Sequence, residues 1–220
     1  SGFAHDINDA GQIVGESQIA GDTYTHATIW NNHLPTDLGT LGAGENSVAW
    51  AINNQGVAVG TNDLASGLRT ATRFDQTGIT DIGLAIGATG PSVAWDINDH
   101  GVIVGQAPLS PGFAKGFYYS NTDGGLSAGT PRFFNGGANL SVNNAGESVG
   151  HAFFFGDPSV ATHASPDGSG GYDVAEIGPS GLNFSMATAI TDSGIIVGHA
   201  SGLDGDTSGN WQAVIYEPDG

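Results

Sequence analysis

The chain has 220 residues, no cysteine, and a formal net charge of −18, because 22 acidic side chains face only four lysines and arginines. The charge excludes nucleic acid as a partner, since phosphate contacts require lysine and arginine. The lack of cysteine excludes disulfides and thiol chemistry. With 37 glycines, 39% hydrophobic residues and no sustained helical periodicity, the composition favours a packed all-β domain.

One motif occurs five times: an aliphatic residue, a polar turn that ends in glycine and, three residues after this glycine, a Val-Gly pair. The copies begin at Ile7, Ile52, Ile97, Val142 and Ile190. Their spacing of about 45 residues is typical of propeller blades and related repeats. We therefore divide the chain into five units, residues 1–46, 47–91, 92–136, 137–184 and 185–220.

Each unit is predicted to contain four short strands. The first is clearest at Ser47–Ile52, and the second follows at residues 57–60 after an Asn-Asn-Gln-Gly turn that favours a tight hairpin. The third strand is predicted at residues 26–30, 70–74, 115–119 and 212–216. The fourth strand is predicted at residues 36–42, 80–83 and 176–178.

A four-stranded sheet in every unit is the signature of a propeller blade. The sequence therefore predicts an all-β fold, a five-bladed β-propeller that occupies residues 1–220 as a single domain. The last blade is expected to lack its fourth strand, because only residues 217–220 follow its third strand. The turn glycines should have positive φ, which only glycine adopts without strain. These are Gly11, Gly56, Gly101, Gly146 and Gly194.

The pattern Leu-Gly-Thr-Leu-Gly at residues 38–42, followed by Ser-x-Ala-x-x-Ile-Asn-x-x-Gly-x-x-Val-Gly at residues 47–60, resembles the extracellular HAF repeat family of bacteria. His26-Ala27 at the start of a third strand adds to this resemblance, and His151-Ala152-Phe153 occurs at another phase of the repeat. The resemblance implies an exported protein, extracellular or associated with the cell envelope. It implies no known reaction.

Candidate ligand-binding residues lie at the end of the first strands, because these strands line the central channel of a propeller. His5, Trp50 and Trp95 occupy equivalent positions, and we predict that they form a stacking platform for sugar rings. Asp6 and Asp96 follow directly and could accept hydrogen bonds from sugar hydroxyls. The alternative interpretation is that both tryptophans pack neighbouring blades together, since large aromatic side chains usually supply core area.

Metal binding is a second hypothesis. Glu16, His151 and His199 directly follow the Val-Gly pair of their units, so they could converge in a radial fold. Asp-Ile-Asn-Asp at residues 6–9, and the same run at residues 96–99, resemble part of a calcium loop but lack the bidentate glutamate. No cofactor is expected unless these turns bind calcium.

The sequence contains no nucleophile elbow, phosphate loop or metalloprotease helix, so it does not resemble an enzyme. The favoured function is a non-catalytic extracellular binding or surface protein whose partner is a neutral glycan or another cell-surface component, without membrane insertion. One alternative is a polysaccharide hydrolase or lyase that uses the inner-strand carboxylates. Another is a self-assembling surface or filament protein, in which the unpaired edge of the last unit associates head to tail. We expect a monomer.

Overall fold

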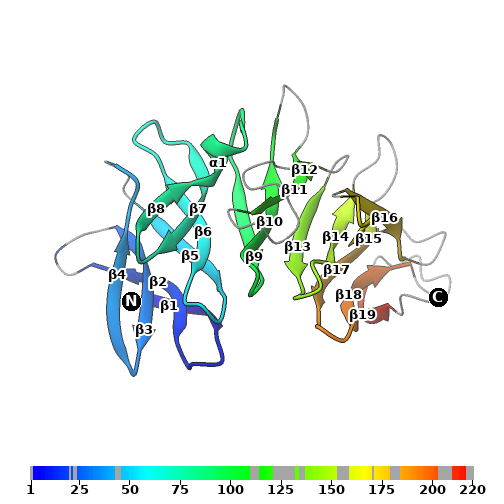
Figure 1. Cartoon of the computed structure of the whole chain (residues 1–220), viewed down its shortest axis with the longest axis horizontal. Helices are drawn as coiled ribbons and strands as arrows, with labels where there is room; N and C mark the ends of the chain where they lie inside the picture. Colours follow the sequence, from blue (N-terminus) through cyan, green and yellow to red (C-terminus); the bar gives the residue numbers. More distant parts are fainter. Residues whose placement is uncertain are drawn as a thin grey trace.

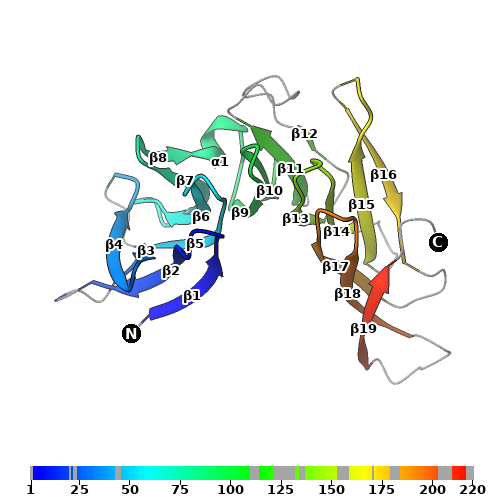
Figure 2. The ribbon, with the colours of Figure 1, turned by 60° about the horizontal axis from the view of Figure 1, so that its bottom comes forward.

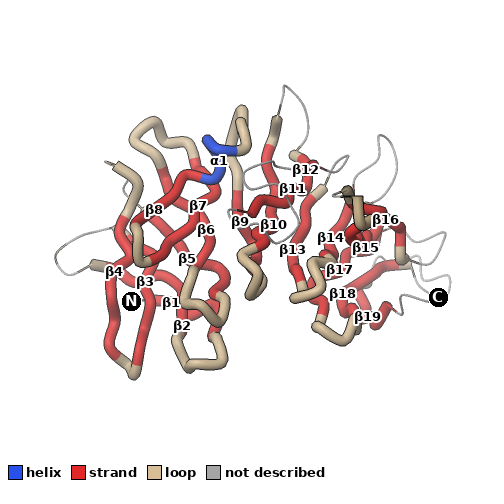
Figure 3. Tube along the Cα trace, in the orientation of Figure 1, coloured by secondary structure: helices blue, strands red, loops and turns tan. Residues whose placement is uncertain are grey.

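The computed structural model describes residues 2–19, 21, 24–42, 46–109, 114–120, 132–133, 137–152, 159–169, 171–178, 184–202 and 210–216. These residues form an all-β structure of five antiparallel sheets, and consecutive strands pair as hairpins within each sheet (Figure 1). In the described residues one helix, α1, interrupts this pattern (Figure 3).

The strands of each sheet fall within one predicted unit, except that the last sheet begins at Phe184, one residue before the expected start of the fifth unit. The first sheet contains β1 (Gly2–Ile7), β2 (Ile13–Gln18), β3 (Thr25–Asn31) and β4 (Leu34–Gly39). The second contains β5 (Ser47–Ile52), β6 (Ala58–Asp63), β7 (Arg69–Asp75) and β8 (Gly78–Asp81), followed by α1 (Ile82–Ala85). The third contains β9 (Val93–Ile97), β10 (Val102–Ala107), β11 (Lys115–Ser120) and β12 (Arg132–Phe133). The fourth contains β13 (Ala138–Val142), β14 (Ser148–Ala152), β15 (Val160–Pro166) and β16 (Tyr172–Glu176). The fifth contains β17 (Phe184–Ile190), β18 (Ile196–Ser201) and β19 (Trp211–Tyr216).

The five sheets follow one another in an arc. The first strands β1, β5, β9, β13 and β17 contact each other in succession, so they form the inner side of the arc. The first and last sheets lie at opposite ends of the arc and are not side by side (Figure 2). A closed ring of five blades therefore stays a prediction. So does the missing fourth strand of the last unit, because residues 217–220 lie outside the described residues.

The first glycine of the motif forms the predicted turn. All five turn glycines have positive φ, between +74° and +82°, which confirms the prediction. In the first unit the Asn8 side-chain oxygen accepts hydrogen bonds from the backbone N–H groups of Ala10 and Gln12, and Gly11 N–H donates to the Asn8 carbonyl. The asparagine thus closes the turn and the glycine supplies its left-handed residue.

The second glycine of the motif is required by close packing between the first two strands. A Cβ atom at Gly15 would lie 1.9 Å from the carbonyl oxygen of Phe3, and one at Gly60 would lie 1.9 Å from that of Val48. Gly105, Gly150 and Gly198 face an inner-strand carbonyl in the same way. No side chain fits there, so the Val-Gly pair recurs in every unit.

The hydrophobic core is divided among the junctions between sheets. Val14 and Ala27 of the first sheet pack against Ala49, Ile52 and Phe74 of the second, and similar clusters fill the later junctions. Each internal sheet is covered on both faces by its neighbours. Among the described residues, the first and last sheets each have one face with no neighbouring sheet against it.

The strand predicted over residues 80–83 ends earlier in the structure. Asp81 is the last residue of β8, and its side chain accepts a hydrogen bond from Leu84 N–H, which starts α1. An aspartate in this position caps a helix by satisfying a free N–H group. The fourth strand of the second unit therefore lies two residues earlier than predicted, at residues 78–81 instead of 80–83.

Candidate functional site

Every inner strand contains a β-bulge at the same place. The pairing register skips one residue between Ala4 and Asp6, between Ala49 and Ala51, and at the corresponding point of β9, β13 and β17. The five bulge residues are His5, Trp50, Trp95, Leu140 and Thr188. A bulge changes the direction of a side chain relative to a regular strand. The predicted ligand-binding residues His5, Trp50 and Trp95 are therefore positioned by the bulges.

The structure brings these three rings together in one row. The ring centroids of His5 and Trp50 are 4.4 Å apart, and those of Trp50 and Trp95 are 5.7 Å apart, with the rings tilted by 45° and 47°. His5 is exposed, whereas both tryptophans are half-buried. Both indole Nε1 atoms are buried and have no hydrogen-bond partner among the described residues. Each tryptophan thus packs on its neighbour and keeps part of its surface accessible.

Asp6 and Asp96 join neighbouring inner strands. Asp6 accepts hydrogen bonds from the backbone N–H groups of Ile7 and Ile52, both at 2.8 Å. Asp96 accepts equivalent bonds from Ile97 and Val142, also at 2.8 Å. Burial raises the pKa of Asp96 to about 6, and the negative charge of Asp6 acts in the same direction. Both carboxylates therefore fasten one sheet to the next.

The asparagines that open the turns form a ladder of hydrogen bonds between units. The side-chain amide of Asn8 donates to the carbonyl of Asn53 at 3.0 Å, and that of Asn53 donates to Asn98 at 3.1 Å. The series continues from Asn98 to Asn143 and from Asn143 to the carbonyl of Thr191. These amides hold the turns in line.

A second ladder, here called the turn ladder, joins the residues that follow these asparagines. Its members, in chain order, are Asp9, Asn54, Asp99, Asn144 and Asp192. Asn54 donates its side-chain amide to Asp9 at 2.9 Å and to Asp99 at 3.1 Å. Asn144 donates in the same way to Asp99 and Asp192. Acceptor and donor side chains therefore alternate from unit to unit.

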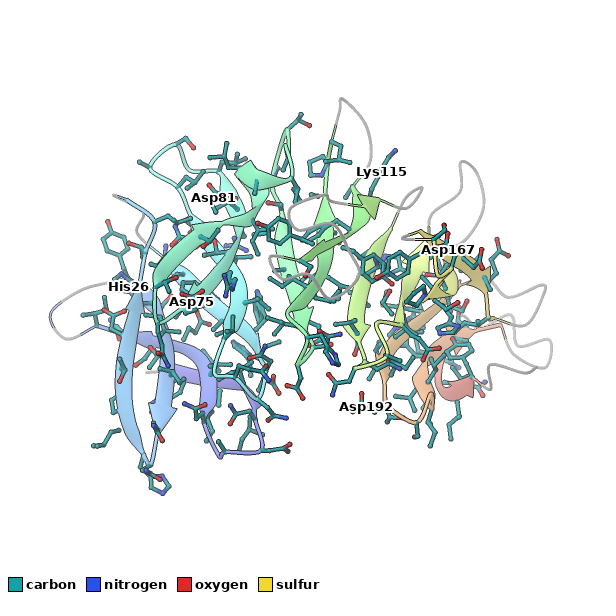
Figure 4. All side chains as sticks on the ribbon, in the orientation of Figure 1. His26, Asp75, Asp81, Lys115, Asp167 and Asp192 are labelled. Atoms are coloured by element: carbon teal, nitrogen blue, oxygen red, sulfur yellow. The ribbon has the colours of Figure 1, made fainter. Side chains whose placement is uncertain are left out.

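Backbone groups strengthen the turn ladder. The N–H group of each member donates to the side-chain oxygen of the next at 2.7–2.9 Å. Although partial burial acts in the opposite direction, hydrogen bonds from Asn54 and Asn144 lower the pKa of Asp99. Asp192 marks the end of the turn ladder on one edge of the arc, opposite the edge that carries Asp81 and Lys115 (Figure 4). The turns considered for calcium thus use their polar groups to bond one another.

The proposed metal ligands do not form one cluster. Glu16 lies in β2 and accepts a hydrogen bond from Thr25, whereas His151 and His199 lie in β14 and β18. Burial lowers the pKa of His151, and the neighbouring His199 lowers it further. The described part of the chain contains no group of three histidine, aspartate or glutamate side chains close enough to share a metal ion.

The fold and the site define a class of protein: an all-β repeat protein of the β-propeller type with a row of bulged aromatic side chains on its inner strands. One similar solved structure is the crystal structure of TolB from Acinetobacter baumannii, with a TM-score of 0.55 and 12% sequence identity. The match covers 98% of this chain, which spans 57% of that TolB chain. This likeness supports the fold.

The comparisons with protein-family models and with curated protein sequences gave no match. The resemblance to HAF repeats stays a prediction from the sequence. Across the described residues, no helix has the length and apolar character needed to cross a membrane.

Proposed function

We propose that the chain is a non-catalytic binding module of the β-propeller type whose ligand is a neutral glycan of the cell surface. The observation that carries this proposal is the row of His5, Trp50 and Trp95 at equivalent bulges of adjacent inner strands. A repeated aromatic row offers several apolar ring surfaces along one direction, which suits a chain of linked sugar rings.

The charge of the molecule narrows the class of glycan. With a net charge of −18, the chain repels acidic polysaccharides at neutral pH. A neutral sugar can instead place its apolar face on Trp50 and its hydroxyl groups near the exposed ring of His5. An exported protein, outside the cell or in the envelope, would meet such glycans, in agreement with the resemblance to HAF repeats.

Hydrolysis by Asp6 and Asp96 has less support than binding. Each carboxylate already accepts two backbone N–H bonds, one from the residue that follows it and one from the neighbouring sheet. A general acid and its partner must reach the scissile bond. The raised pKa of Asp96 has a structural cause in burial, so it does not by itself indicate catalysis.

The test is a screen of neutral glycans against the native chain, followed by calorimetry on the best ligand. Trp50→Ala should weaken binding about ten-fold or more, because a stacking surface is lost, and His5→Ala should also weaken it. Trp211→Ala is the matched control, since it removes a tryptophan from β19, away from the row. Equal losses for Trp50→Ala and Trp211→Ala, or no binding of any neutral glycan, would refute the proposal.

Release of reducing ends from the bound glycan separates binding from hydrolysis. The binding proposal predicts no release with the native chain. Release that disappears in Asp96→Asn, while the fold is retained, would establish the hydrolase alternative.

A further inference from the structure

Equivalent residues of the five units can be compared with one another, and their exposed fractions show that both ends of the arc are uncovered. Ile7 in the first sheet is 60% exposed, whereas its four equivalents, Ile52, Ile97, Val142 and Ile190, are 5–9% exposed. Val197 in the last sheet is 39% exposed, whereas its equivalents Val14, Val59, Val104 and Val149 are fully buried. Both positions keep an aliphatic side chain, although no neighbouring sheet among the described residues covers it.

The first end face is defined by Ala4, Ile7, Ile13 and Trp30. Ala4 is exposed, whereas its equivalents Ala49, Ala94 and Ala187 are fully buried. Trp30 pairs with Ile13 across β2 and β3, and together with Phe3 and Ala4 they line a hollow on this face. In the second sheet the same positions are Ala49, Ile52, Ala58 and Phe74, and all four are buried in the junction with the first sheet.

The last end face is defined by Val197, Ala213, Ile215 and Trp211. Ala213 is exposed, whereas its equivalents Ala27, Ala71 and Ala161 are fully buried. Ile215 and Trp211 are 70% and 55% exposed. At the first junction the equivalent side chains Val14 and Ala27 pack on the next sheet. The last end face therefore has the residues of the first-sheet side of this junction, and the first end face has those of the second-sheet side. Each end face can thus pack against a further unit of this repeat.

The turn ladder determines which kind of unit fits. Both of its ends are aspartates, Asp9 and Asp192, whereas each internal junction pairs an aspartate with an asparagine. Direct contact between the two ends, in a closed five-unit ring or between two copies, would place two carboxylates side by side. Like charges in this position repel, and no amide would lie between them. Thr191 also lacks the amide that Asn143 and its equivalents use to bond the next turn.

We propose that the end faces are docking surfaces for a sixth unit of the same repeat whose turn carries asparagine at the ladder position. An asparagine between Asp192 and Asp9 would donate to both carboxylates, as Asn54 donates to Asp9 and Asp99. Its sheet would cover Ile7 and Trp30 on one side and Val197 and Ile215 on the other. This proposal does not depend on the proposed glycan site, because it rests on the end faces and the turn ladder and not on the ring row of His5, Trp50 and Trp95.

A fused sixth unit tests the proposal directly. A copy of residues 47–91 is placed before Gly2 of the full chain, so that Gly2 follows Pro91 at the repeat position that Ser92 occupies in the native chain. The extended chain should melt about 5 °C higher than the native chain and bind less of a dye that reports exposed apolar surface. The matched control is the same extension with Asn54→Asp in the added copy, which should lose most of the gain at neutral pH. Equal melting of the two extended chains would overturn the proposal.

A substitution in the unextended chain gives an independent test if the extended chain does not fold. Asp9→Asn makes the two ends complementary, so this variant should show concentration-dependent association in sedimentation experiments. Asp173→Asn removes the same charge from the exposed strand β16 and is the control. The native chain and Asp173→Asn should stay monomeric. Association of the native chain at neutral pH, or identical behaviour of the two variants, would overturn the proposal.

Discussion

Two glycines in each unit are required for different reasons, and substitutions distinguish them. At Gly56 the backbone has φ of +76°, and an alanine there meets only the far end of the Gln12 side chain. At Gly60 an alanine would lie 1.9 Å from the carbonyl oxygen of Val48. The first change strains one residue, and the second forces two strands apart.

We therefore expect Gly60→Ala to destabilise the protein more than Gly56→Ala. Left-handed alanine costs about 1–2 kcal/mol, whereas overpacking against a backbone atom costs up to about 3 kcal/mol and more where nothing yields. Chemical denaturation of both variants measures the difference in the free energy of unfolding. A Gly60→Ala variant as stable as Gly56→Ala would mean that the inner bulge is not formed as described.

The buried carboxyl of Asp96 gives a pH dependence of defined sign. Its pKa is raised from 3.8 to about 6 in the folded protein, so the folded state binds this proton more tightly than the unfolded state. The contribution is fully present below pH 3.8 and is lost as the pH rises through 6, with a total of about 3 kcal/mol.

The stability of the native chain relative to Asp96→Ser should therefore increase as the pH falls from 7 to 4. Serine stands at the equivalent position, Ser141, so the variant is compatible with the repeat. Denaturation at a series of pH values measures this difference, and NMR titration of the Asp96 carboxyl gives its midpoint. A midpoint below 4, or a difference that does not change with pH, would contradict the assignment.

The first and third strands could be predicted closely from the sequence, and the fourth strands could not. β5 coincides with the predicted Ser47–Ile52, because the apolar run over residues 48–52 stops at the Asn-Asn-Gln-Gly turn, which fixes its end. β8 ends at Asp81, two residues before its predicted end, because the Asp81 side chain accepts a hydrogen bond from Leu84 N–H and starts α1 instead. This cap is a local contact between residues three positions apart, which strand patterns alone do not indicate.

The candidate site could be predicted only in part from the sequence. Equivalent positions in the repeat identified His5, Trp50 and Trp95 as a group, and the structure places their rings in one row. The bulge that positions them was missed, although the glycine opposite it, in the Val-Gly pair, was the available signal. Asp6 was predicted to bind sugar hydroxyls, but its bond to Ile52 N–H joins residues 46 positions apart, which no local pattern indicates.

The valine of the Val-Gly pair should contribute more to the free energy of unfolding in an internal sheet than in the last sheet. Val59 is fully buried between the second and third sheets, whereas Val197 is 39% exposed on the last end face. Val59→Ala should cost about 2 kcal/mol, from lost burial and the cavity left behind. Val197→Ala should cost clearly less, because water already reaches this side chain. Equal losses in chemical denaturation would show that Val197 is covered in solution.

The molecule as a whole carries a large excess of negative charge, which destabilises a compact state through repulsion between its carboxylates. Raising the ionic strength shortens the range of this repulsion. We expect the melting temperature to rise by several degrees between low salt and about 0.5 M salt, and to the same extent with sodium or choline chloride. A further rise with micromolar calcium, absent with magnesium, would instead support the calcium hypothesis for the turns.

The turn ladder also limits how the length of the chain can change. Removing residues 47–91 would bring the unit that carries Asp9 against the unit that carries Asp99, and two carboxylates would meet. Removing residues 47–136 would bring Asp9 against Asn144, and the alternation would survive. Internal units that differ in this way are not interchangeable, so we expect a gene that encodes them to gain or lose internal units in pairs more easily than singly, whereas one asparagine unit can be added at an end. The side chains of five short turns thus impose an even-number rule on insertions and deletions inside the repeat.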